Sequence, residues 1–220
     1  MASVPQQYFE WYYNANIWKT LTYRGVRTLK YPMDLWNYQE IITERNVQWV
    51  LETGTRHGGS ALFFADLLTN LGRGGKVVTI DVEPELRIDP RSHPRIELLI
   101  GDSGSAEVME RAWRELRRTA PGEVFVILDS DHRKPHVLRE LEAIVPRMRA
   151  GDYLVVEDTV VNGHPVRPNH GPGPLEAVQE FVASRSGLLA ADPRREGRFG
   201  FSAAQGGYFI RTNEATAAGR

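Results

Sequence analysis

Gln48-Trp49-Val50-Leu51-Glu52-Thr53-Gly54-Thr55-Arg56-His57-Gly58-Gly59-Ser60 is the stretch that decides the fold. It opens with a short apolar run, typical of a buried β-strand, and the glycines that follow indicate a tight turn. Apolar residues then recur at helical spacing from Ser60 to Leu71, and residues 72–75 end that helix. The stretch therefore predicts the first strand, turn and helix of a parallel sheet.

The same alternation of strand and helix continues along the chain. It predicts, in order, a strand at 76–81, a strand at 96–102, a helix at 106–118, a strand at 123–129, a helix at 134–148 and a strand at 152–158. After a loop rich in Gly, Pro, His and Asn, we expect a helix at 175–183 and then two antiparallel strands with no helix between them, near 188–191 and 207–211. Such strand–helix repeats predict a doubly wound, mostly parallel seven-stranded α/β sheet.

The aromatic residues divide the chain into two parts. Ten of the 21 aromatic side chains lie at or before position 38. We interpret residues 1–40 as an aromatic-rich helical segment that packs on the main domain, forms a lid over a pocket, or contacts another copy of the chain. Residues 41–213 then form the α/β domain, and residues 214–220 form a small polar tail.

Composition excludes several classes of protein. The chain has 220 residues, a net charge of −1 and no cysteine, so disulfides, thiolate metal sites and cysteine nucleophiles are excluded. A near-neutral charge argues against binding to nucleic acid. There is no apolar run of about 18 residues and no signal-peptide pattern at the start, so we expect a cytoplasmic protein without a membrane span.

Acidic residues end the predicted strands. They are Asp81, Asp102, Asp129 and the pair Glu157-Asp158. Ligands of an open α/β sheet bind outside the carboxyl ends of its strands, so these acids are expected at the site. Single acids at such positions often cap the next helix. Several together indicate a cationic ligand.

The glycine turn and the second strand indicate a nucleoside-like ligand. Gly54 and Gly58 allow unusual dihedral angles and a close approach of the backbone to a ligand. The spacing is not the dinucleotide pattern G-x-G-x-x-G, which argues against an NAD dehydrogenase. Asp81 is placed to accept both hydroxyls of a ribose, and Asp102 lies where an adenine edge would reach.

These motifs resemble those of class I methyltransferases, which bind S-adenosylmethionine (SAM). The stretches Tyr23–Lys30, Leu128–His132 and Gly151–Asp158 more narrowly resemble the cephalosporin hydroxylase and rhamnosyl O-methyltransferase family. The likeness extends from about residue 20 to residue 211. It implies a Rossmann-like SAM-binding domain over residues 41–213 and a SAM-binding set of Glu52, Gly54, Thr55, Gly58, Ser60, Asp81, Asp102, Ser103 and Asp129.

The resemblance also implies a Mg²⁺ site and a catalytic base. Asp129, Glu157 and Asp158 would supply carboxylates to the metal, and His132 would act as the general base beside the catalytic Asp129. Neighbouring strands lie about 4.8 Å apart, so these acids should converge, and an all-oxygen set suits Mg²⁺. The alternative is that Asp129 caps the next helix while the other two acids pair with arginines such as Arg133 or Arg167.

The expected reaction is methyl transfer to a hydroxyl of a sugar or natural-product scaffold. His132 would remove the proton, and the oxygen would attack the SAM methyl group in line. Tyr31, Asn162 and His164 are the expected substrate contacts, and a homo-oligomer is expected from the aromatic N-terminus. Two alternatives stay open: an iron-dependent hydroxylase, which would need two histidines and one carboxylate at the metal, and a non-catalytic SAM-fold binding protein.

Overall fold

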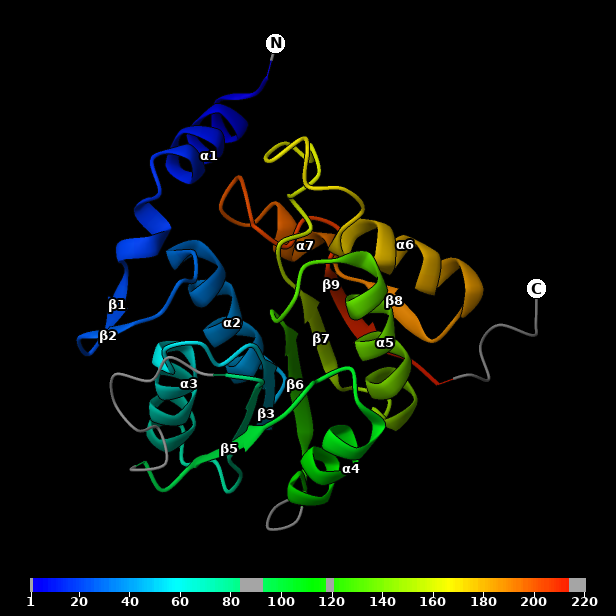
Figure 1. The fold of residues 1–220 in the computed structure, drawn as a ribbon. Helices are drawn as coiled ribbons and strands as arrows, with labels where there is room; N and C mark the ends of the chain where they lie inside the picture. The colour runs from blue at the N-terminus through cyan, green and yellow to red at the C-terminus, as the bar shows by residue number, and fades with distance from the viewer. Residues whose placement is uncertain (1, 84–92, 118–120, 214–220) are drawn as a thin grey trace.

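A seven-stranded sheet forms the centre of the molecule (Figure 1). The computed structural model describes residues 2–83, 93–117 and 121–213. Within these ranges the strand order is β5-β4-β3-β6-β7-β9-β8, with bounds β3 Val47–Thr53, β4 Val77–Asp81, β5 Ile96–Ile100, β6 Glu123–Leu128, β7 Tyr153–Val156, β8 Leu189–Ala191 and β9 Tyr208–Arg211. Strands β3 to β7 pair in parallel, and β9 pairs antiparallel with both β7 and β8. The predicted doubly wound, mostly parallel seven-stranded sheet is confirmed.

Helices cover both faces of the sheet, which explains why the central strands are apolar throughout. One face carries α2 (Pro32–Glu44) and α3 (Gly59–Asn70). The other carries α4 (Ala106–Glu115), α5 (Lys134–Ile144) and α6 (Pro174–Ser184). Each face has its own buried apolar cluster, so the sheet is the middle layer of three (Figure 1).

Two details differ from the sequence prediction. A short helix, α7 (Pro193–Glu196), separates β8 from β9, so the expectation of two strands with no helix between them is wrong. Four residues are too few to produce a helical repeat of apolar positions. Helix α5 ends at Ile144 and continues as the 3₁₀ turn η3 (Val145–Arg147), because Pro146 cannot extend an α-helix.

The aromatic N-terminal segment packs on the main domain. It comprises α1 (Val4–Asn14), η1 (Ile17–Thr20) and the hairpin of β1 (Thr22–Tyr23) and β2 (Val26–Arg27). Phe9, Tyr12 and Tyr31 form a buried cluster with residues of the loop after β7. Helix α2 runs across residue 40, where we placed a boundary, and the expected tail at 214–220 lies outside the described residues.

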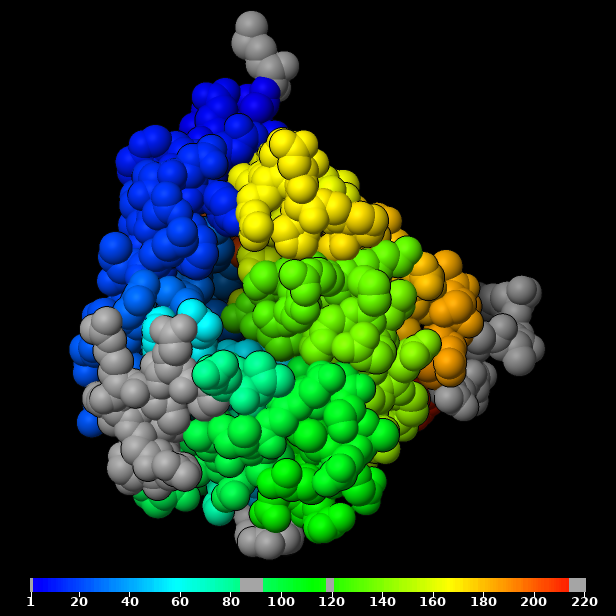
Figure 2. Space-filling view, viewed as in Figure 1, coloured from blue at the N-terminus to red at the C-terminus, as the bar shows by residue number. Residues whose placement is uncertain are grey.

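The strand order reverses between β3 and β6. The chain proceeds from β3 outward to β5 and then returns to β6 on the other side of β3. Ligands of doubly wound sheets bind at this point, beyond the carboxyl ends of the strands. Figure 2 shows a hollow where the blue N-terminal segment, the yellow loop after β7 and the green residues after β6 meet.

Candidate active site

A cavity of about 590 Å³ opens at the carboxyl ends of β3, β4, β5, β6 and β7. Its wall contains seven of the nine residues expected to bind SAM, namely Gly54, Thr55, Ser60, Asp81, Asp102, Ser103 and Asp129. Glu52 and Gly58 do not line it. The volume lies within the usual range for small-molecule sites, about 300–1,000 Å³. The strand ends therefore meet around one cavity of ligand size.

The glycines of the turn are needed by the protein's own backbone. Gly54 has a φ of +88°, and a Cβ added there would lie 2.0 Å from the carbonyl oxygen of Asp129. A Cβ on Gly59 would lie 2.3 Å from the carbonyl oxygen of Arg27. Gly58, with a φ of +83°, is the N-cap of α3. Gly54 lines the cavity, and the missing side chains of Gly54 and Gly59 also let neighbouring chain segments that carry site residues pack closely.

Glu52 lies beneath the cavity and supports its wall. Its carboxylate accepts a hydrogen bond from Thr79 Oγ1 at 2.8 Å, and Thr79 Oγ1 lies 2.7 Å from Thr55 Oγ1. Burial raises the pKa of Glu52, although Lys30, Ser60 and Thr79 oppose this effect. Glu52 thus helps to position Thr55 in the cavity wall through Thr79.

Asp81 and Asp102, for which we expected contacts to ribose and adenine, both lie in the cavity wall. Asp81 Oδ2 accepts the backbone N–H of Arg56 at 2.8 Å, which fixes its carboxylate in the cavity wall. Asp102 Oδ1 accepts the N–H of Gly104 at 2.8 Å. Both side chains line the cavity, so each carboxylate is oriented by the backbone beside it.

A buried glutamate that we did not single out ties two cavity loops together. Glu140 Oε1 accepts hydrogen bonds from Ser103 Oγ at 2.5 Å and from Ser130 Oγ at 2.7 Å. His136, on the same helix and in the cavity wall, lies 3.2 Å from Ser103 Oγ, and its hydrogen bond to Glu140 raises its pKa. The loop after β5 and the loop after β6 are therefore held together by α5.

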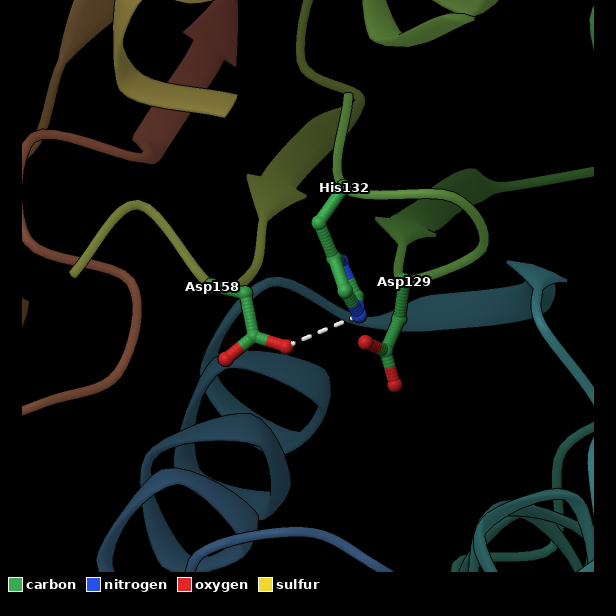
Figure 3. Close-up of side chains that lie close together, drawn as sticks. All are labelled: Asp129, His132 and Asp158. Carbon is green, nitrogen blue, oxygen red and sulfur yellow. Dashed lines mark ion pairs between the residues drawn. The ribbon is translucent and has the colours of Figure 1, made fainter. Parts of the chain in front are cut away.

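Asp129, His132 and Asp158 point toward one another (Figure 3). One ligand atom from each lies within 4.8 Å of the others. His132 Nε2 lies 3.1 Å from Asp158 Oδ2, and both side chains are about one quarter exposed, at 28% and 25%. Because β6 and β7 are neighbours in parallel register, the residues after them meet as predicted.

Glu157 is a buried residue of the cavity wall and is held by two residues that sequence reasoning missed. Lys30 Nζ donates to Glu157 Oε2 at 2.9 Å and to Asp129 Oδ2 at 2.5 Å. Tyr38 Oη donates to Glu157 Oε1 at 2.7 Å. Lys30 lies in a stretch that carries the family resemblance. Its contacts with the two acids could not be predicted from local sequence patterns, because these partners are about a hundred residues away in the chain.

The alternative of helix capping and arginine pairing is not what the structure shows. The N-cap residue of α5 is Arg133, whose guanidinium pairs with Asp131 at 3.5 Å. Asp129 and Glu157 bind Lys30, and Asp158 pairs with His132. The carboxylates thus face one another around the cavity.

The acid cluster (Asp129, Glu157 and Asp158) holds more negative than positive charge. Burial and neighbouring carboxylates raise the pKa of both Asp129 and Glu157, even though Lys30 opposes both shifts. Burial disfavours the charge on Lys30, but the surrounding carboxylates outweigh it and raise its pKa. A group of oxygen donors short of positive charge fits a divalent cation.

Of the three expected substrate contacts, Tyr31 lines the main cavity, together with Tyr13, Trp18 and Arg167. Asn162 Nδ2 instead donates to Glu176 Oε1 at 2.7 Å, and His164 Nε2 lies 3.0 Å from the same oxygen. His164 lines a second cavity of about 480 Å³ next to α1. The structure therefore does not bring Asn162 and His164 to the wall of the main cavity.

Comparison with known proteins identifies the family. The model of the rhamnosyl O-methyltransferase/CmcI family matches residues 15–212. The chain is 41% identical to rhamnosyl O-methyltransferases of Mycobacterium bovis, over 95% of this chain and 85% of the relative, and of Mycobacterium leprae, over 95% and 91%.

Solved structures share the fold. A CmcI structure with Mg and SAM matches with a TM-score of 0.71 at 23% identity, covering 89% of this chain and 78% of that one. A MycE methyltransferase structure with Mg, S-adenosylhomocysteine (SAH) and mycinamycin VI matches with a TM-score of 0.56 at 20% identity, covering 83% and 50%. Among the helices of the described ranges, none is both long and apolar enough to span a bilayer. The chain belongs to the rhamnosyl O-methyltransferase/CmcI family and is a SAM-dependent O-methyltransferase.

Proposed function

We propose that this protein transfers the methyl group of SAM to a hydroxyl of a sugar or natural-product scaffold, with the help of a divalent cation, Mg²⁺. The observation that carries the proposal is the meeting of Asp129, Asp158 and His132 on the wall of one cavity that also contains Gly54 and Asp81. One part of that cavity, beside Gly54 and Asp81, suits the cofactor, and another part carries the acids and the histidine needed for the metal and the proton transfer.

The cofactor would occupy the part of the cavity formed by the glycine turn and the ends of β4 and β5. Asp81 would accept the ribose hydroxyls, because its carboxylate is held in the cavity wall by the Arg56 N–H. Asp102 and Ser103 would lie along the adenine, and Thr55 and Ser60 also line the cavity. These residues bind and orient the donor. Orientation is their main contribution, because the sulfonium of SAM already carries the leaving group of the methyl transfer.

Asp129, Glu157 and Asp158 would hold the cation. Asp129 and Asp158 reach the cavity directly, and Glu157 also lines it. Both Glu157 oxygens accept protein hydrogen bonds, but each carboxylate oxygen has a second lone pair. When bound, Mg²⁺ lowers the pKa of a substrate hydroxyl and orients the oxygens around it.

His132 would take the proton from the acceptor hydroxyl. Its Nε2 faces the Asp158 carboxylate, so Nε2 would carry the hydrogen and Nδ1 would take the proton, and Asp158 would orient the ring and stabilise the imidazolium. The same imidazole could serve as a metal ligand with Asp129 and Asp158. We assign it to proton transfer because Mg²⁺ prefers oxygen ligands and three carboxylates are already present.

The acceptor would enter beside the aromatic N-terminal segment. Tyr13, Trp18 and Tyr31 line the cavity there, with Arg167 from the loop after β7. Flat apolar side chains next to a hydrogen-bond donor suit a ring with several hydroxyls. The names of the mycobacterial relatives refer to a rhamnosyl group, and mycinamycin VI is bound in the MycE structure, which supports a sugar acceptor on a larger scaffold of antibiotic or polysaccharide type.

We also propose that the chain forms homo-oligomers. Tyr8, Trp11 and Trp36 are large side chains of the N-terminal part that are exposed by 46%, 56% and 58%. Large exposed aromatic side chains are typical of surfaces that contact a protein partner.

A methyl-transfer assay tests the proposed function. Purified protein is freed of metal with a chelator, and SAH formation from SAM is measured with a panel of deoxysugar glycosides, before and after Mg²⁺ is restored. We expect turnover with at least one glycoside, and only after Mg²⁺ is added. Equal turnover in the presence of chelator would refute the requirement for Mg²⁺. SAM binding without turnover on any glycoside would favour a non-catalytic protein.

An iron-dependent hydroxylase has little support from the site. Such enzymes use two histidines and one carboxylate, and the candidate metal group of the described residues contains His132 with two aspartates. Restoring activity with Fe²⁺ and 2-oxoglutarate, but not with SAM and Mg²⁺, would favour this alternative.

A further inference from the structure

Lys30 is a buried cation within the acid cluster, and no step of methyl transfer uses it. Its side chain is 1% exposed, and its ammonium group contacts Asp129 at 2.5 Å and Glu157 at 2.9 Å. Breaking up such a buried group of charges by removing one partner leaves the others uncompensated. The ammonium therefore holds together two carboxylates that would otherwise repel each other.

The placement of Lys30 depends on the N-terminal segment. Lys30 follows Leu29, which has a φ of +55° and lines the cavity with Thr28. The carbonyl of Arg27 lies so close to Gly59 that no side chain fits between them. The segment is thus fixed against the start of α3, and its lysine is delivered to the ends of β6 and β7.

The ammonium group of Lys30 neutralises part, but not all, of the negative charge of the carboxylates. It faces Asp129, Glu157 and the more distant Glu52, and Asp158 adds a further negative charge at the cavity wall. A divalent cation bound by the same carboxylates would be repelled by the ammonium. Lys30 therefore has two opposing effects. It stabilises the charged acids when no metal is bound, and it lowers the affinity of the same acids for a divalent cation.

We propose that Lys30 is a positioning residue that acts as a resident monovalent cation: it keeps Asp129 and Glu157 assembled when no metal is bound and keeps a bound divalent cation exchangeable. The inference rests on the proposed metal site. Lys30 sets the strength of metal binding rather than taking part in the reaction, and through it the N-terminal part of the chain does more than form a cavity wall.

The test measures Mg²⁺ binding and Mg²⁺-dependent stability in three variants. Lys30→Met removes the charge and keeps a long side chain, Lys30→Arg keeps the charge, and Lys19→Met is a control at an exposed lysine of the same segment. Titration calorimetry with MgCl₂ gives the affinity, and thermal unfolding with and without MgCl₂ gives the shift in Tm.

For Lys30→Met we expect a lower Tm without Mg²⁺, a larger Tm increase on adding Mg²⁺ than in the wild type, and Mg²⁺ binding at least about tenfold tighter. Lys30→Arg and Lys19→Met should keep the wild-type affinity. A Lys30→Met protein that folds only with Mg²⁺ also supports the proposal.

Three results would overturn it: an unchanged Mg²⁺ affinity in Lys30→Met, a Lys30→Met protein that stays unfolded in Mg²⁺, or tighter binding in Lys30→Arg as well. If the wild type itself binds no Mg²⁺, the proposed metal function fails first, and the calorimetry separates that outcome from the others.

Discussion

Replacing His132 with glutamine should stop proton transfer while leaving the fold and the cofactor region intact. Glutamine can still donate a hydrogen bond toward Asp158, but it cannot accept a proton at neutral pH. The loss of a general base lowers turnover by about 10²- to 10⁴-fold, which is about 3–5 kcal/mol in the barrier. His132 and Asp158 are both partly exposed, so losing the contact between their side chains costs at most about 1 kcal/mol of stability.

Turnover is measured as SAH formed per minute by liquid chromatography at saturating SAM and Mg²⁺, and SAH affinity is measured by calorimetry. We expect the SAH affinity of His132→Gln to stay within about twofold and its Tm to fall by no more than about 4 °C. His93→Gln is the matched control, because His93 pairs with Asp66 outside the cavity wall. Wild-type turnover in His132→Gln would refute the base assignment, and so would a loss of SAH affinity as large as the loss of turnover.

Three further predictions concern residues that support the site. Gly54→Ala should lose more than about 2 kcal/mol of stability in urea unfolding, since its Cβ would meet the Asp129 carbonyl and φ is +88°; a smaller loss would mean that β3 and β6 separate easily. Glu140→Ala should weaken SAH binding and lower stability by about 1–3 kcal/mol for each of the hydroxyls of Ser103 and Ser130 left without an acceptor; calorimetry with unchanged SAH affinity would contradict this. Burial opposes ionisation of Glu176, but hydrogen bonds from Asn162, His164 and Gly173 hold its pKa at about 2. Glu176 therefore contributes stability, at most about 3 kcal/mol, that is present above pH 4.5 and is lost as the pH falls toward 2. The stability difference between wild type and Glu176→Gln should shrink over that pH range, and a constant difference would show that Glu176 is not ionised in the fold.

The sheet and the acids at its edge could be predicted because both are local patterns. Each central strand is a short apolar run, and Asp81, Asp129 and Asp158 come within two residues of a strand end. Parallel pairing then brings the ends of neighbouring strands to one edge without any long-range information. The cavity and most of its expected wall follow from this rule.

The parts that were missed depend on contacts between distant segments. Lys30 reaches Glu157 from the chain just before α2, and Tyr38 reaches it from α2 itself. No spacing in the sequence encodes either contact. Asn162 and His164 lie in a loop with the right composition for a substrate wall, but Glu176 on α6 binds both side chains. Their orientation is set by tertiary hydrogen bonds rather than by their position after β7.

A crystal structure of the protein with SAH and Mn²⁺, analysed by anomalous scattering, tests the central claim most directly. We expect one strong anomalous peak within coordination distance, about 2.0–2.2 Å, of carboxylate oxygens from Asp129 and Asp158, with the SAH ribose against Asp81. A peak elsewhere on the protein, or SAH bound outside the cavity beside Gly54, would contradict it.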